Sequence, residues 1–211
     1  DEKVDRRKVL GMTLQAVYIG DEQIYNWLRN FRPNWDWQVP VTSIDQFTEY
    51  ANNGTISSDT AIIMFDSRLY SNPLRIYNNP NASPQQQDKA NTDIDNFLSW
   101  VYNATQSALT IIINYSNDEA NINDELQAYS GQIGGTLKPY WWIEPKKPNL
   151  YLDTAIKEYI NSPESDPDTV NIIAASEGLH VPANEDNGGA LGSIKETISN
   201  VVSGSGDMDT G

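Results

Sequence analysis

The chain has 211 residues, with 29 acidic and 14 basic side chains, a formal net charge of −15 and a pI near 4.2. This charge argues against nucleic acid or an anionic membrane surface as a partner, because both are negatively charged. With no cysteine and a single histidine, His180, the sequence excludes disulfides and thiol nucleophiles and nearly excludes a Ser-His-Asp triad. No run approaches the length of a membrane-spanning helix, so we expect no membrane insertion.

The first residues, 1–11, are rich in charge and lack the apolar run of a secretory signal. We interpret them as an N-terminal extension and expect a cytoplasmic protein. The main folded unit is expected to cover residues 12–160, which contain all the aromatic side chains.

Within residues 12–160, apolar runs of strand length alternate with segments of helical period. The expected strands are 14–19, 37–41, 61–65, 109–113 and 140–143, and the expected helices are 23–31, 44–52, 92–102, 121–129 and 151–160. Runs 61–65 and 109–113 lack polar alternation, which is typical of central strands covered on both faces. Five strands alternating with helices predict an α/β fold, a three-layer, doubly wound parallel sheet.

One connection departs from this pattern. Residues 67–91 contain three prolines, a tract of three glutamines and several asparagines. Strand-to-helix loops usually have about two to six residues, so we interpret this segment as a long loop insertion. We favour a mobile insertion over a lid.

The C-terminal segment, residues 161–211, has no aromatic residue and carries nine acidic groups against one basic group. Such a composition cannot bury enough apolar surface to offset the entropy lost on ordering. We expect an acidic, largely disordered linker or tail, in which residues 170–175 have strand character and residues 191–202 are weakly amphipathic.

Acidic side chains follow two strands that are neighbours in the order 2-1-3-4-5. Asp21 and Glu22 follow the first strand, and Asp66 follows the third. Ligands of open α/β sheets bind outside the carboxyl ends of the strands, where these groups would converge. Carboxylate oxygens there suit a hard cation such as Mg²⁺. Asp21 can equally be the N-cap of the following helix.

The segments VYIGDE (residues 17–22) and IIMFD (residues 62–66) resemble the first strand and the phospho-acceptor strand of response-regulator receiver domains, which share the CheY/flavodoxin-like strand order. The resemblance implies that Asp66 is the phospho-acceptor and that Asp21, Glu22 and Asp66 hold the metal. It also implies that Ser116 is the switch hydroxyl and that Lys147 contacts the phosphoryl group.

The sequence also departs from receivers. Gly20 stands where they carry their first acidic residue, and Glu144-Pro145 fits the spacing of the Lys-Pro pair better than Lys147-Pro148. An atypical, pseudo-receiver pocket of this kind resembles the N-terminal part of TadZ/CpaE-type ParA/MinD-like ATPases, which place pilus or secretion machinery. The phosphate-binding motif G-x-x-x-x-G-K-[ST] does not occur, so the chain is not itself the ATPase.

Three functions are compatible with these patterns. We favour a non-enzymatic regulatory or protein-interaction domain that binds a protein partner or a second copy of itself, with no cofactor or with weakly bound Mg²⁺. The first alternative is an active receiver that accepts phosphate on Asp66 with Mg²⁺. The second is an FMN-binding flavodoxin-like protein, which the strand order and the abundant Trp and Tyr favour.

Overall fold

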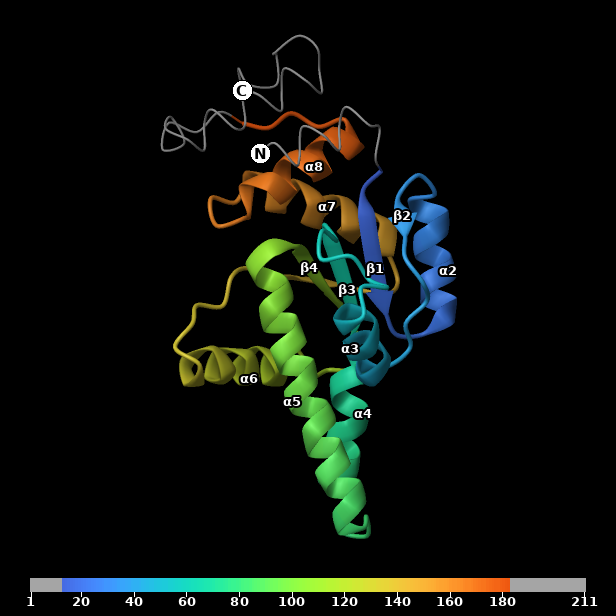
Figure 1. Ribbon diagram of the computed structural model, residues 1–211, viewed down its shortest axis with the longest axis vertical. Coiled ribbons are helices and arrows are strands. Elements are labelled where there is room, and N and C mark those ends of the chain that lie inside the picture. Colours follow the sequence, from blue (N-terminus) through green and yellow to red (C-terminus); the bar gives the residue numbers. More distant parts are fainter. Residues whose placement is uncertain (1–12, 183–211) are drawn as a thin grey trace.

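The computed structural model describes residues 13–182, which are built on a five-stranded parallel sheet (Figure 1). The strand order is β2-β1-β3-β4-β5, with Ala16 of β1 in register with Ile62 of β3. The strands are β1 Gln15–Ile19, β2 Asp36–Trp37, β3 Ile62–Asp66, β4 Leu109–Ile113 and β5 Trp141–Ile143. The expected parallel sheet and its order are confirmed.

Helices cover both faces of the sheet. They are α2 Glu22–Phe31, α3 Ile44–Asn52, α4 Arg68–Tyr77, α5 Pro84–Ser107, α6 Glu119–Gln132, α7 Pro148–Asn161 and α8 Pro167–Glu177. Buried side chains of α2, α7 and α8 form one core cluster with the sheet, and those of α3, α4, α5 and α6 form the other. The described residues therefore have the three-layer, CheY/flavodoxin-like α/β fold.

Strand β1 shows how one sheet serves two cores. Ala16 and Tyr18 belong to the cluster with α2, α7 and α8, whereas Val17 and Ile19 belong to the opposite cluster. Successive side chains of a strand point to opposite faces, so both sets of positions must be apolar. This requirement explains the continuous apolar runs in the sequence.

The expected loop over residues 67–91 is wrong. Helix α4 begins directly after β3, and α5 begins at Pro84 rather than at residue 92. The side chain of Ser83 caps α5 by accepting a hydrogen bond from Gln86 N, and the side chain of Gln86 accepts one from Ser83 N. Pro84 occupies the first turn of the helix. Prolines and polar residues here start a helix rather than break one. Figure 1 shows the far ends of α4 and α5 projecting beyond the carboxyl edge of the sheet.

The boundary expected at residue 160 is also wrong. Residues 167–177 form α8, not the strand expected over residues 170–175, and Val170, Ile173 and Ala174 are buried in the core. The helix begins with an Asp166 cap followed by proline and ends at Gly178, which has the left-handed φ of +66°. The absence of aromatic residues suggested disorder, but aliphatic side chains are enough to pack α8 against the core.

A polar cluster joins α8 to the end of α2. Arg32 Nε lies 3.0 Å from Glu177 Oε1, and Trp35 Nε1 donates to the same carboxylate at 2.8 Å. At the other end of α8, Thr169 Oγ1 donates to the carbonyl of Ser107 at 2.6 Å. The Arg32–Glu177 ion pair is largely buried, so loss of either partner would leave a poorly solvated charge.

Two predicted regions lie outside the described residues: the N-terminal extension and the rest of the acidic segment, residues 183–211. The weakly amphipathic stretch 191–202 belongs to the latter. Over residues 13–182, none of the helices has the length and apolar character needed to cross a membrane.

Candidate functional site

The carboxyl ends of β1, β3 and β4 bring together a cluster of acidic, basic and aromatic side chains. Asp66 is the last residue of β3, and Arg68 is the first of α4. Asp21 caps α2 after β1, and Tyr115 follows β4. We call Asp21, Asp66, Arg68 and Tyr115, together with Tyr18 of β1, the edge cluster.

Asp66 lies at the centre of the edge cluster with its carboxylate almost fully buried. Both oxygens are engaged: Oδ1 accepts from Arg68 N at 2.8 Å and Arg68 Nε at 3.0 Å, while Oδ2 accepts from Arg68 Nη2 at 2.6 Å and Tyr18 OH at 3.2 Å. Two parallel guanidinium bonds to one carboxylate form the strongest class of protein hydrogen bond. The buried carboxylate is thus balanced by a cation from its own chain.

Arg68 links the edge cluster into one unit. Its Nη2 atom lies 3.7 Å from Asp21 Oδ2, and its guanidinium carbon lies 4.0 Å from the centre of the Tyr115 ring. The hydrogen bond to Asp66 raises the pKa of the Arg68 guanidinium above its usual value, so the group stays charged. A cation over an aromatic face is attracted to the ring quadrupole, which adds to the ion pair.

Tyr18 and Gly20 complete the cluster from β1. Burial, followed by the charge of Asp66, raises the pKa of Tyr18, so its hydroxyl remains a donor to that carboxylate. A Cβ atom at Gly20 would lie 2.5 Å from Tyr18 OH and 2.6 Å from the Asp66 Cβ, and the φ of this residue is +152°. Glycine is therefore required where receivers carry an acidic residue, because the tyrosine occupies that space.

The predicted metal ligands have other positions and partners. Asp21 accepts from Gln23 N at 2.8 Å as the α2 cap, so the helix-cap interpretation is confirmed. Glu22 is exposed in the first turn of α2, and no hydrogen bond or ion pair of its carboxylate occurs within residues 13–182.

The two residues predicted to contact a phosphoryl group differ in position. Ser116 Oγ lies 3.3 Å from Ser67 Oγ, which in turn accepts from Tyr115 N at 2.8 Å, so Ser116 borders the edge cluster. Lys147 is exposed in the turn before α7, and among the described residues its ammonium group has no carboxylate partner.

The edge cluster does not fit the magnesium ion that the resemblance implies. In the described part of the chain, no group of three or more His, Asp or Glu side chains is arranged to hold a metal. The carboxylates of Asp21 and Asp66 instead share the Arg68 guanidinium, whose Nη2 atom lies 3.7 Å and 2.6 Å from their respective Oδ2 atoms. A cation entering between them would meet this fixed positive charge at close range.

Sequence reasoning placed Asp21 and Asp66 together but missed Arg68, Tyr18 and Tyr115. A signal existed for Arg68, which follows Asp66 by two residues at a strand-to-helix turn and can fold back onto it. Tyr18 lies in the apolar run of the first strand, which predicts only a buried position. Nothing in the sequence identified its hydroxyl as a partner of Asp66.

Comparison of the chain with known proteins gives no match. No protein-family model, no curated protein and no solved structure matches the chain. The function must therefore be argued from the residues of the fold and its edge cluster.

Proposed function

We propose that this chain is a receiver-like, non-enzymatic regulatory domain that binds another protein and in which Arg68 takes the place of the metal ion. The observation that carries the proposal is the engagement of both Asp66 oxygens by one guanidinium, at 3.0 Å and 2.6 Å. The domain then keeps one conformation and offers a constant docking surface.

The state of Asp66 argues against phosphoryl transfer. A carboxylate that attacks a phosphoryl group must have a free oxygen, whereas here the guanidinium and the Tyr18 hydroxyl hold both. Breaking the ion pair between the buried Asp66 and the partly exposed Arg68 costs about 2 kcal/mol, which a phosphoryl donor must overcome before reacting. A switch also needs contacts that differ between its two states. In the edge cluster, the hydrogen bonds of Asp66 are already complete in the conformation that the structure shows.

The active receiver and the FMN-binding protein remain alternatives with less support. An active receiver needs Arg68 to leave Asp66 and a metal to enter. A flavin phosphate needs free N–H groups after β1, but Gly20 N donates to Val41 O at 2.9 Å and Asp21 adds a negative charge. Both alternatives therefore require the described edge to rearrange.

Protein binding is supported by the projecting pair α4 and α5. Ile76 and Tyr77 lie in the last turn of α4 and are 45% and 46% exposed. Apolar side chains at the end of a projecting element suit contact with a protein partner or a second copy of the chain.

The wider setting that we propose, from the resemblance alone, is the N-terminal part of a TadZ/CpaE-type ATPase. The reading frame after residue 211 tests this proposal.

The central experiment treats the protein with beryllofluoride or acetyl phosphate in the presence of Mg²⁺, and measures intact mass and amide spectra. We expect no stoichiometric adduct on the wild type and none on Asp66→Ala. Arg75→Ala is the control for a change in α4, because this second arginine of the helix is exposed and, within residues 13–182, bonds to Asn72 alone. A stoichiometric, Asp66-dependent adduct with spectral changes that reach Ser116 would overturn the proposal in favour of a phospho-switch.

A further inference from the structure

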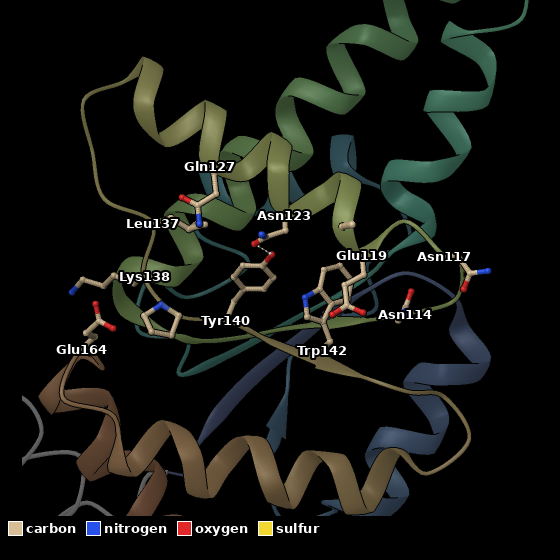
Figure 2. A pocket seen from close by; sticks show the side chains of 12 residues that line it. Asn114, Asn117, Glu119, Asn123, Gln127, Leu137, Lys138, Tyr140, Trp142 and Glu164 are labelled. Atoms are coloured by element: carbon tan, nitrogen blue, oxygen red, sulfur yellow. Dashed lines mark hydrogen bonds between the residues drawn. The ribbon is translucent and has the colours of Figure 1, made fainter.

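A groove of about 730 Å³ lies beside the edge strand of the sheet, apart from the edge cluster. Figure 2 shows three of its walls: α6, strand β5, and the segment that leads into β5. Six of its twelve lining side chains end in a planar amide or carboxylate group: Asn114, Asn117, Glu119, Asn123, Gln127 and Glu164.

Two aromatic rings form one side of the groove. The rings of Tyr140 and Trp142 lie with their centres 5.8 Å apart and their planes at 60°. Both residues are only partly buried, so ring surface remains open to the groove. The face of an aromatic ring carries partial negative charge, which attracts the weakly positive C–H groups of a ligand.

Helix α6 faces these rings with polar side chains. Glu119, Asn123 and Gln127 are spaced four residues apart, so they share one face of the helix. Figure 2 shows Asn123 beside Tyr140, Glu119 beside Trp142 and Gln127 beside Leu137. Tyr140 OH donates to Asn123 Oδ1 at 2.8 Å. This bond orients the Asn123 amide and leaves its amino group without a protein partner among the described residues.

A second observation points to a missing hydrogen-bond donor. Asn114 Oδ1 is buried and has no partner in the described part of the protein, although its residue lines the groove. A buried acceptor without a partner costs about 1–3 kcal/mol. A small rotation of the Asn114 side chain toward the groove would allow a ligand hydroxyl to supply the donor.

We propose that this groove binds a neutral saccharide. Sugar hydroxyls donate and accept hydrogen bonds, and the amide groups of Asn114, Asn117, Asn123 and Gln127 do both as well. The C–H face of a sugar ring packs on Tyr140 and Trp142. The volume lies within the range of small-molecule sites, about 300–1,000 Å³.

Other ligand classes fit less well. Glu119 and Glu164 outnumber the one basic residue of the lining, Lys138, so a phosphate or another anion is repelled. A peptide in an extended groove relies on apolar pockets for alternate side chains, whereas here half of the lining side chains end in a planar polar group. The inference does not depend on the proposed function, because no residue of the edge cluster lines the groove.

The test is NMR titration of the full ¹⁵N-labelled chain with maltotetraose, cellotetraose and fully N-acetylated chitotetraose, all of them neutral, each at millimolar concentration. Side-chain amide groups and the Trp142 indole N–H give separate signals, so contact with the groove is observed directly. We expect at least one tetrasaccharide to shift the signals of Trp142, Asn123 and Gln127 in a saturable way.

Paired variants locate the contact. Asn123→Ala should weaken binding about five-fold to ten-fold, the effect of losing one hydrogen bond. Asn121→Ala is the matched control, because this exposed asparagine of the same helix does not line the groove and should leave binding unchanged. Gln127→Ala repeats the test at a residue that has no bond to Tyr140, in case Asn123→Ala disturbs the fold.

Three results would overturn the inference. The first is the absence of shifts with all three tetrasaccharides. The second is binding that Asn123→Ala and Gln127→Ala leave unchanged. The third is an unrelated tetrapeptide that gives the same saturable shifts as the sugars, which would make the groove a peptide site.

Discussion

Replacement of Arg68 by alanine gives the most direct test of the edge cluster. The substitution removes the guanidinium from Asp66, from Asp21 and from the face of Tyr115. The Asp66 carboxylate keeps the Tyr18 hydroxyl and one backbone N–H as donors but loses its cation. We expect the free energy of unfolding to fall.

The structure sets the size of this effect between two limits. The Asp66 side chain is 3% exposed, and removing the partner of a buried charge costs about 3–5 kcal/mol. The Arg68 side chain is 37% exposed, so water screens part of its charge, and exposed pairs are worth less than about 1 kcal/mol. A buried carboxylate paired with a partly exposed arginine should therefore give a loss of about 2 kcal/mol.

Urea unfolding followed by tryptophan fluorescence measures the loss in a double-mutant cycle. The cycle comprises the wild type, Arg68→Ala, Asp66→Asn and the double variant. Because asparagine needs no cation, the second substitution should cost less when Arg68 is already absent, with a coupling of about 1–2 kcal/mol. Arg75→Ala, on the exposed side of the same helix, should change stability by less than about 0.5 kcal/mol.

Additivity within about 0.5 kcal/mol would refute the reasoning, because it would show that the two side chains do not interact in solution. A loss in Arg75→Ala as large as that in Arg68→Ala would point instead to a general effect on α4. Either result would remove the physical basis for a cluster that holds a single conformation.

Three further outcomes follow from the structure. Glu177→Ala should cost about 1–2 kcal/mol and expose α8 to proteolysis, because the Trp35 indole N–H and one side of the largely buried Arg32 guanidinium lose this carboxylate, while Arg32 keeps its ion pair with Asp153. Equal protection of α8 in the variant would contradict this. Gly20→Ala should lower the free energy of unfolding by about 2–4 kcal/mol, because the new Cβ would lie 2.5 Å from the Tyr18 hydroxyl. An unchanged urea midpoint of unfolding would be inconsistent with the geometry of the edge cluster. Burial raises the pKa of Tyr140 to about 12, so the contribution of this group to stability is fully present below pH 10 and is lost as the pH rises from 10 to 12. In Tyr140→Phe the loss of stability over this pH range should be smaller by about 1–2 kcal/mol, after allowance for solvent screening, and an unaltered pH profile would contradict the argument.

The sheet could be predicted from the sequence, whereas helices α4 and α8 and the first turns of α5 could not. Continuous apolar runs identify β3 and β4, because only central strands need apolar side chains on both faces. The first turns of α5 consist of proline, glutamine and other polar residues, a composition that loops share. Helix α8 buries Val170, Ile173 and Ala174 but no aromatic residue, so composition alone gave no sign that it belongs to the core.

The candidate site could be predicted only in outline. Strand order brings the ends of β1 and β3 together, so the approach of Asp21 to Asp66 follows from topology. The role of Arg68 does not, because it depends on α4 beginning immediately after β3 and turning the side chain back onto Asp66. The sequence interpretation placed a loop at that point, and a loop fixes no side-chain direction.

An internal arginine and a bound metal ion balance a buried carboxylate in different ways. The occupancy of a metal site varies with metal concentration and affinity, so the charge of the site can change. A guanidinium attached two residues away is always present at high effective concentration, so the Asp66 charge stays balanced whatever the Mg²⁺ concentration. In the proposed function, regulation therefore acts through surfaces away from the edge cluster. Within residues 13–182, the exposed end of α4 and the groove beside β5 are two such surfaces.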